Sequence, residues 1–167
     1  MVNIPQEIFD LYNETVDDMI NSNFGVNCKI VYPPEREQCN NCVYDSIGRK
    51  SANRYAHGGP APFNFGVCPV CGGEGYKEVE SSETIKLRVY YEMKSFIKLA
   101  GMVEIPDGSV QVIGFLSDQD KIRQSNRIIL NSDMEGVAGN VYEKLSEPVP
   151  HGFRKNRYFI CMLKRSS

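Results

Sequence analysis

Two CxxC pairs constrain this chain more than any other feature of its sequence. The first is Cys39-Asn40-Asn41-Cys42 and the second is Cys68-Pro69-Val70-Cys71. Each short turn presents two sulfurs on one side of the backbone, and two such pairs can converge on one tetrahedral metal ion. Because all-thiolate tetrahedral coordination suits Zn²⁺, we predict one structural zinc ion per chain. Its ligands are expected to be Cys39, Cys42, Cys68 and Cys71.

The second pair is the more specific half of this pattern. It continues as Cys71-Gly72-Gly73-Glu74-Gly75, which resembles the CxxCxGxG pattern of chaperone-type zinc ribbons, where glycines let backbone amides turn toward the sulfurs. The gap between Cys42 and Cys68 is longer than the roughly 15–20 residues of the commonest four-cysteine pattern, so an inserted loop is expected. Four protein ligands leave no position for water, which predicts a structural rather than a catalytic metal.

Two disulfides or four free thiols are the alternatives to a metal. A redox CxxC is disfavoured, because such a motif normally opens a helix whose N-terminus lowers the thiol pKa, and neither pair precedes a predicted helix. The remaining cysteines, Cys28 and Cys161, lie in apolar strand-like runs and are expected to be buried small side chains. His57 can in principle replace a cysteine as a ligand, but with four cysteines present we expect it to form hydrogen bonds within its loop.

Composition predicts one ordinary folded domain with an appendage. The chain has 167 residues, of which 41% are apolar and 24% charged, and its formal net charge is −2. Phosphate neutralisation usually requires a clustered basic excess, so this balance argues against a general nucleic-acid binder. The first residues show no basic region followed by an apolar run, and no stretch reaches the ~20 apolar residues of a transmembrane helix. We therefore expect neither a signal peptide nor a membrane partner.

Hydrophobic patterning divides the chain into three parts, 1–33, 34–80 and 81–167. The first is predicted to hold a helix with one apolar face and then a short strand over Cys28–Tyr32. The second is poor in aliphatic residues and rich in turn formers, so it is predicted to be a zinc-ribbon loop module that the metal orders. The helix prediction rests on apolar residues at three- and four-residue steps, namely Ile8, Tyr12, Val16, Met19 and Ile20.

In the third part the apolar pattern has a period of two. Ile85, Leu87, Val89 and Tyr91 alternate with Lys86, Arg88 and Tyr90, as expected of a half-buried strand. A capping box over residues 117–120 is predicted to open a short helical turn. Further strands are predicted at Met102–Ile105, Ser109–Phe115, Ile128–Asn131, Asn140–Leu145 and Arg157–Lys164, the first two forming a hairpin. So many short strands predict a mainly β (α+β) fold, a small antiparallel barrel or sandwich, because closure protects sheet edges.

Catalytic patterns are sparse, and we expect no enzyme activity. The two histidines, His57 and His151, are each next to a glycine, and the sequence contains no GxSxG elbow, P-loop or HExxH. Some carboxylates could pair in space, but their spacing is typical of helix starts and turns. These carboxylates are Asp17, Asp18, Asp118, Asp120, Asp133 and Glu135.

Taken together, these features resemble the neck proteins of tailed bacteriophages. In particular, the chain is similar to head-closure, or stopper, proteins in a zinc-ribbon-bearing variant. The resemblance covers most of the chain, and its loop and cysteine motif are more distinctive than its strands. It is carried by the N-terminal helix, the run Lys29–Pro33, the first CxxC, the loop Gly58–Gly66, the CPxCGGxG at Cys68–Gly75 and a β-rich tail that includes Val110–Gly114 and Tyr158–Arg165.

The resemblance implies a small β-barrel protein that forms a homo-oligomeric ring at the head-to-tail joint of the virion, assembled in the host cytoplasm. Its partners would be portal and adaptor proteins of the head, tail-side proteins, and genomic DNA that passes through the ring without sequence-specific binding. Family members close the channel with a loop or strand that points into the lumen. The candidates here are the zinc-ordered segment Glu35–Lys77 and the loop Glu147–Arg154. No catalysis is implied.

Two other functions compete with this interpretation. A zinc-ribbon nucleic-acid-binding accessory protein needs basic and aromatic residues near the cysteines, which Arg36, Tyr44, Arg49, Lys50, Arg54 and Tyr55 supply. A chaperone-like ribbon would hold unfolded clients, but a complete chaperone of that type repeats the CxxCxGxG unit, and this chain has a single one. The basic C-terminal residues are expected to form a solvated face. They are Arg154, Lys155, Arg157, Lys164 and Arg165.

Overall fold

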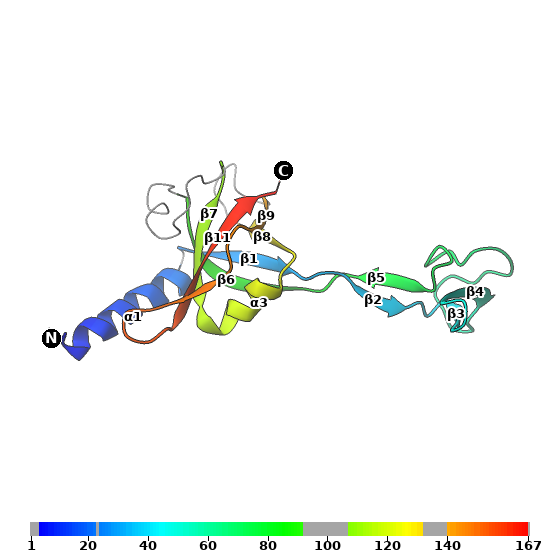
Figure 1. Cartoon of the computed structure of the whole chain (residues 1–167), viewed down its shortest axis with the longest axis horizontal. Helices are drawn as coiled ribbons and strands as arrows, with labels where there is room; N and C mark the ends of the chain where they lie inside the picture. The colour runs from blue at the N-terminus through cyan, green and yellow to red at the C-terminus, as the bar shows by residue number, and fades with distance from the viewer. Residues whose placement is uncertain (1–3, 23, 92–106, 132–139, 167) are drawn as a thin grey trace. The chain divides into compact units, whose positions relative to one another are not determined.

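The computed structural model describes residues 4–22, 24–91, 107–131 and 140–166, and the chain divides into two compact units (Figure 1). The barrel unit comprises residues 1–32 and 82–167, and the cysteine module comprises residues 33–81. Val31 pairs with Ser82 in the ladder of the barrel unit. The module is therefore an insertion between two neighbouring strands of the barrel.

Six antiparallel strands close into a barrel. Their order is β11-β7-β6-β1-β8-β9, and β9 returns to β11 through the pair Lys144 and Leu163. The strands are β1 (Gly25–Val31), β6 (Ser82–Tyr90), β7 (Val110–Phe115), β8 (Arg127–Asn131), β9 (Val141–Lys144) and β11 (Tyr158–Arg165). Closure pairs the two outer strands with each other, which removes the edges of the sheet. The predicted mainly β architecture is confirmed. Of the two predicted alternatives, a barrel and a sandwich, the structure is a barrel.

The core of the barrel lies between the inward faces of these strands. The predicted period of two in β6 is confirmed, since Ile85, Leu87 and Val89 are buried. Burying one such side chain stabilises a fold by roughly 1.5–3 kcal/mol. Opposite them, Gly114 in β7 permits a close approach, because an added Cβ would lie 2.5 Å from Leu87 Cδ2 and 2.7 Å from the Phe159 ring.

The predicted N-terminal helix is present as α1 (Gln6–Asn21), and Ile20 is buried and Tyr12 and Val16 are half-buried, but the rest of its buried face differs from the prediction. Phe9 and Ile20 are its buried side chains, whereas Ile8 is 50% exposed and Met19 is 37% exposed. The reason is tertiary. The Phe9 ring packs 5.3 Å from that of Phe153, so the helix is rotated toward an aromatic partner that its own periodicity does not reveal.

The predicted helical turn is also present, but the predicted capping box is wrong. The chain passes through a 3₁₀ turn, η2 (Leu116–Asp118), directly into α3 (Gln119–Gln124). The Asp118 carboxylate pairs with Lys121 Nζ at 2.9 Å instead of capping the helix. Among the described helices, none combines the length and the apolar content needed to cross a membrane.

Residues 147–154, expected to be a loop, contain a further strand, β10 (Val149–His151). It pairs with β11, with Pro150 opposite Phe159, and a short outer strand is where proline is tolerated in a sheet. The predicted strand at 102–105, one arm of the expected hairpin, lies outside the described residues, as do Asp133 and Glu135. Its expected partner β7 pairs with β6 and β11.

The cysteine module contains regular structure that its composition did not predict. β2 (Glu35–Gln38) pairs with β5 (Tyr76–Val79), and β3 (Cys42–Asp45) pairs with β4 (Lys50–Tyr55). These strands are short, and their residues are mainly exposed in β2 and half-buried in β3 and β5, so they lack the alternating apolar pattern from which strands are predicted. The module is thus two small ladders joined by loops rather than a loop alone.

Candidate metal centre

The four cysteines of the two CxxC pairs lie together in the cysteine module. Their sulfur atoms are all within 4.8 Å of one another, and all four residues are buried. The sulfurs of Cys39 and Cys68 are 3.9 Å apart, and those of Cys42 and Cys71 are 3.7 Å apart. A tetrahedral ion with metal–sulfur bonds of ~2.3 Å places its ligand sulfurs roughly 3.8 Å apart. The donor atoms and their spacing therefore fit a four-thiolate metal site.

The same distances do not fit two disulfides. A disulfide joins its sulfurs at about 2.0 Å, and all six cysteines of the chain are free thiols. Cys28 and Cys161 are buried in the barrel unit, as predicted. Their thiols donate to the carbonyls of Val26 and Ser146 at 3.4 and 3.2 Å, and burial raises the pKa of each to about 12. They behave as small buried side chains.

Backbone hydrogen bonds hold the two CxxC turns in place. The Cys39 N–H donates to the Gly75 carbonyl at 2.9 Å, which ties the first pair to the glycines after the second. The Gly75 N–H donates to Cys71 Sγ at 3.3 Å. Gly75 has φ +82°, and an added Cβ would lie 2.8 Å from the Ser51 amide nitrogen. The last glycine of the CxxCxGxG pattern is thus required both for its backbone conformation and for its close approach to β4.

Asn41 is a site residue that sequence reasoning missed. It is fully buried, and its Nδ2 donates to the Ala61 carbonyl at 2.8 Å and to Cys68 Sγ at 3.5 Å. Its Oδ1 accepts from the Ala61 N–H at 2.8 Å. One side chain therefore fixes the loop after β4 and donates to a ligand sulfur. Its place inside the first CxxC was visible in the sequence, but that position alone does not reveal which partners it meets.

The thiols differ in how easily they lose a proton. Burial raises the pKa of Cys68, but hydrogen bonds from Asn41 and from the backbone amides of Cys71 and Val70 outweigh it and lower the value to about 6. Burial raises the pKa of Cys42 to about 12, although a hydrogen bond with Ser51 opposes it. Since a metal ligand must be a thiolate, these hydrogen bonds favour the form of Cys68 that could bind a metal, and a metal bound at this site would displace protons from thiols that carry them.

His57 lies outside this cluster. Among the described residues, the group able to hold a metal ion consists of the four cysteines. The His57 ring instead packs edge-on against Tyr55, with ring centroids 5.8 Å apart. Tyr55 is the last residue of β4, and its hydroxyl donates to the Gly59 carbonyl at 2.7 Å, which ties the following loop to that strand.

The module carries an open hollow of about 800 Å³ beside the second CxxC turn. We call it the module hollow. Of the six basic and aromatic residues that the sequence placed near the cysteines, it is lined by Arg36, Tyr44, Arg49 and Lys50. Arg54 is exposed elsewhere on β4, and Tyr55, at the end of β4, packs against His57. The fold thus gathers most of this set onto one surface.

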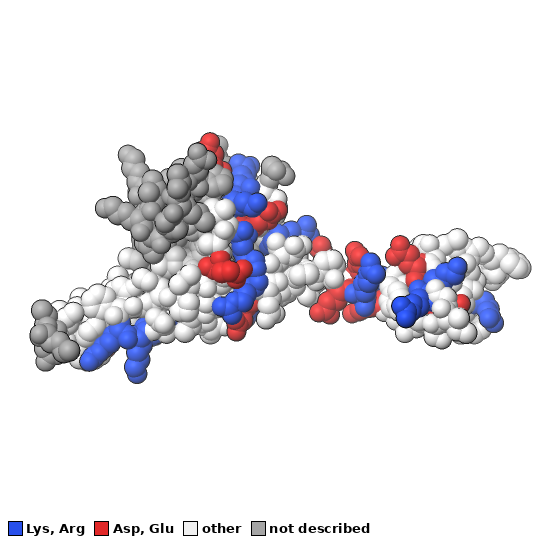
Figure 2. All heavy atoms as spheres, in the orientation of Figure 1, with Lys and Arg blue, Asp and Glu red and all other residues white. Residues whose placement is uncertain are grey.

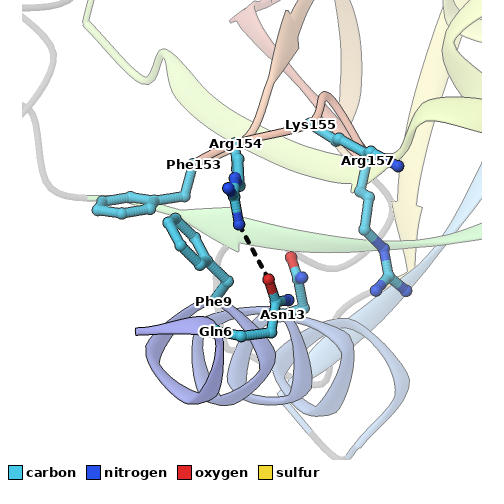
Figure 3. A pocket seen from close by; sticks show the side chains of 7 residues that line it. All are labelled: Gln6, Phe9, Asn13, Phe153, Arg154, Lys155 and Arg157. Atoms are coloured by element: carbon cyan, nitrogen blue, oxygen red, sulfur yellow. Dashed lines mark hydrogen bonds between the residues drawn. The ribbon is translucent and has the colours of Figure 1, made fainter. Parts of the chain in front are cut away.

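A second hollow, of about 580 Å³, lies in the barrel unit between α1 and residues 153–157, and we call it the helix hollow (Figure 3). The Arg154 guanidinium lies 4.8 Å from the centre of the Phe9 ring and donates to Gln6 Oε1 at 2.9 Å. Arg157 donates to Asp17 Oδ2 at 2.9 Å. These basic side chains, expected to be merely solvated, hold α1 against the barrel.

Of the described carboxylates that could have formed an acid/base pair, Asp17, Asp118 and Asp120 contact cations. Asp17 pairs with Arg157, and Asp118 pairs with Lys121, each at 2.9 Å. Asp120 pairs with Arg123 at 2.7 Å. In each case the geometry is that of a local ion pair.

No protein-family model, no curated protein and no solved structure matches this chain.

Proposed function

We propose that this chain is a structural protein of the tailed-bacteriophage neck. It forms a homo-oligomeric ring between the DNA-filled head and the tail and helps to close the DNA channel. The observation that carries this proposal is a closed six-stranded barrel that bears the cysteine module as an insertion between β1 and β6. A head-closure protein needs a rigid body that packs into a ring and an extension that acts on the channel. The barrel suits the first task and the module the second.

The way the module is inserted supports this division of tasks. Its two ends meet at neighbouring positions of one ladder, Val31 and Ser82. A long insertion between paired strands adds only a slowly growing loop-closure entropy, so the barrel tolerates an extension of this size. Of the two candidate closing segments, Glu35–Lys77 lies within a compact unit of its own. Glu147–Arg154 holds β10 and a residue tied to α1, which makes it the weaker candidate.

We propose that the metal is Zn²⁺, one structural ion per chain. Four thiolates close its coordination sphere. Structural zinc in comparable small sites contributes on the order of 10–16 kcal/mol of binding free energy. The module needs such a contribution because only one partly buried apolar residue, Phe63, packs against its cysteine cluster. Elemental analysis of the purified chain should give one zinc per chain. A value near zero after metal-replete expression would overturn this part of the proposal.

The proposed partners follow from the ring. Identical copies in a ring meet through heterologous interfaces, and the two faces of the ring would contact the portal and adaptor proteins and the tail-side proteins. Genomic DNA would pass through the centre without sequence-specific contacts. No catalytic step is part of the proposal.

The test is to quantify the chain by mass spectrometry in purified particles. DNA-filled tailed virions should contain it in multiple copies, and portal-bearing empty procapsids should lack it, because a head-closure protein is added after packaging. Absence from both particles would overturn the assignment and leave the nucleic-acid-binding accessory protein as the better interpretation.

A further inference from the structure

The module hollow has the chemistry of a binding site that ring assembly does not require. We propose that it binds phosphate groups of the backbone of duplex DNA. The choice of duplex DNA rests on the proposed function, in which DNA passes through the neck. The phosphate chemistry rests on the residues of the hollow itself.

The hollow is built where the second CxxC turn meets β3 and β4. The Ser51 N–H donates to the Gly73 carbonyl at 3.1 Å, which brings the start of β4, and with it Lys50, beside the glycine turn. On another wall the Tyr76 hydroxyl donates to the Tyr44 hydroxyl at 2.6 Å, and the two rings pack edge-on with centroids 5.0 Å apart. The Tyr44 hydroxyl accepts this bond, so its own proton remains for another acceptor.

Charge in the hollow favours an anion. Three cations line it, Arg36, Arg49 and Lys50, against one carboxylate, Glu74. Arg36 has only a long, exposed pair with Glu78 at 3.9 Å, and such pairs are weak. Within the module, all of whose residues the structure describes, Arg49 and Lys50 form no ion pair. The hollow therefore combines a net positive charge with donors whose hydrogen-bonding capacity is largely unused.

These donors match phosphate better than they match a protein surface. Guanidinium, ammonium and hydroxyl groups are the side chains that contact phosphate oxygens in nucleic-acid complexes. A protein partner would need a larger apolar area at the centre of its interface, and the apolar side chains that line the hollow are Val67 and the rings of Tyr44 and Tyr76. The hollow is open rather than enclosed, which suits a long polyanion that crosses it.

The surrounding charges keep the expected affinity modest. Figure 2 shows basic side chains at the end of the module that carries β3 and β4, while acidic and basic side chains alternate along β2 and β5. The carboxylates of that ladder and its ends are Glu35, Glu37, Glu78 and Glu80. They limit the attraction to the hollow, so contacts with DNA should be few and strongly dependent on salt.

The experiment measures binding of a fluorescent mixed-sequence DNA duplex to the full-length, zinc-loaded chain by anisotropy over a range of salt concentrations. The test variant is Arg49→Gln/Lys50→Gln. Glutamine keeps an unbranched side chain at Arg49, which has φ +50°, and Lys50→Gln alone serves as a second variant free of that constraint. The matched control is Arg154→Gln/Lys155→Gln, which removes two charges from the helix hollow. Zinc content and the far-UV spectrum establish that each variant is folded.

The wild-type chain should bind DNA, and its affinity should fall steeply as salt rises. The double variant at the module hollow should bind at least tenfold more weakly at low salt, and its slope of log K against log salt should be shallower by about 1.8, which corresponds to two phosphate contacts. Lys50→Gln should give about half of that change in slope, and the helix-hollow control should stay within twofold of wild type. An equal loss in that control would show unspecific electrostatics and overturn the inference, as would a wild-type chain that does not bind.

Two competitors identify the chemistry of the ligand. If polyglutamate displaces DNA when its carboxylates are as concentrated as the DNA phosphates, the partner is an acidic protein. If inorganic phosphate displaces DNA at the same concentration of phosphate groups, the hollow is a small-anion site. Either result overturns the DNA assignment. A chain that is present in virions but does not bind DNA refutes the hollow alone. A chain that binds DNA but is absent from particles refutes the neck assignment.

Discussion

The barrel unit and the cysteine module are ordered by different physical means. The barrel encloses a continuous apolar core to which every strand contributes, with side chains such as Leu87, Leu130 and Phe159 fully buried. The module buries its four cysteines, Asn41 and Ser51, with Phe63 packed against the cysteines. Order in the barrel is therefore spread over many contacts, whereas order in the module should depend on its cysteine cluster and the proposed metal. Changes should have graded effects in the first and nearly all-or-none effects in the second.

The largest expected effect comes from removing one metal ligand. Cys71→Ser should release the metal, because a hydroxyl is a poor replacement for a thiolate on zinc, and the binding lost is on the order of 10–16 kcal/mol in comparable sites. Residues 34–80 should become sensitive to protease while the barrel keeps its β spectrum and its thermal transition. Elemental analysis and limited proteolysis measure both outcomes.

Cys161→Ser is the matched control for that variant, because it removes a buried thiol of the barrel unit. It should leave the metal content unchanged. If Cys71→Ser instead unfolded the whole chain, the module would belong to the cooperative unit of the barrel, and the contrast between the two units would be wrong.

A cavity in the barrel should have the opposite signature. Leu130→Ala removes a fully buried side chain and should lower the free energy of unfolding by about 2–5 kcal/mol, as measured by urea denaturation. Zinc per folded chain should not change. Leu11→Ala, at a helix position that is 64% exposed, should stay within about 0.5 kcal/mol of wild type. Loss of zinc in proportion to the loss of barrel stability would contradict independent ordering of the module.

The sequence predicted those features that a local pattern encodes. The cysteine pattern predicted the correct residues of the cluster, because each CxxC turn is local and a tetrahedral metal site needs two such pairs. The alternation at Ile85, Leu87 and Val89 likewise follows from the geometry of a single strand. Each CxxC turn and the strand alternation are properties of neighbouring residues.

Features set by distant partners could not be predicted in this way. Phe9 is buried rather than Ile8 because Phe153 packs on it, and nothing near Phe9 in the sequence says so. The order of the barrel strands, with β1 between β6 and β8, is equally invisible to periodicity. Asn41 belongs to the site through Ala61 and Cys68, which become its neighbours only after the module folds.

Asn41 offers a finer test of the module. Asn41→Ala removes the hydrogen bond to Cys68 Sγ and both bonds to Ala61 but keeps all four thiolates. Loss of a residue that supports a metal ligand typically lowers metal affinity by about 10–100-fold, which competition with a chelator measures. Asn40→Ala changes the exposed neighbour in the same CxxC and should have little effect. Equal affinity in the two variants would show that the four thiolates alone determine binding.

The smallest expected effect concerns the contact between α1 and the barrel. Tyr158→Phe removes the hydrogen bond from the tyrosine hydroxyl to Asp17 Oδ1, at 2.7 Å, and should lower the free energy of unfolding by about 1 kcal/mol. Asp17 keeps its pair with Arg157, so α1 should remain in place and the zinc content should be unchanged.

The difference in free energy of unfolding between wild type and Tyr158→Phe should depend on pH, which a simple packing defect would not cause. Burial, and then the bond to Asp17, raise the pKa of Tyr158 above its ordinary value of 10.0. A group whose pKa is raised by folding stabilises the folded state fully below its unfolded pKa, and that contribution is lost as the pH rises above it. The gap in stability between wild type and Tyr158→Phe should therefore be constant up to about pH 9 and narrow above pH 10, since the other tyrosines titrate in both proteins. Urea denaturation from neutral to alkaline pH measures the gap, and a gap independent of pH across pH 10 would show that the hydroxyl of Tyr158 does not hold α1 on the barrel.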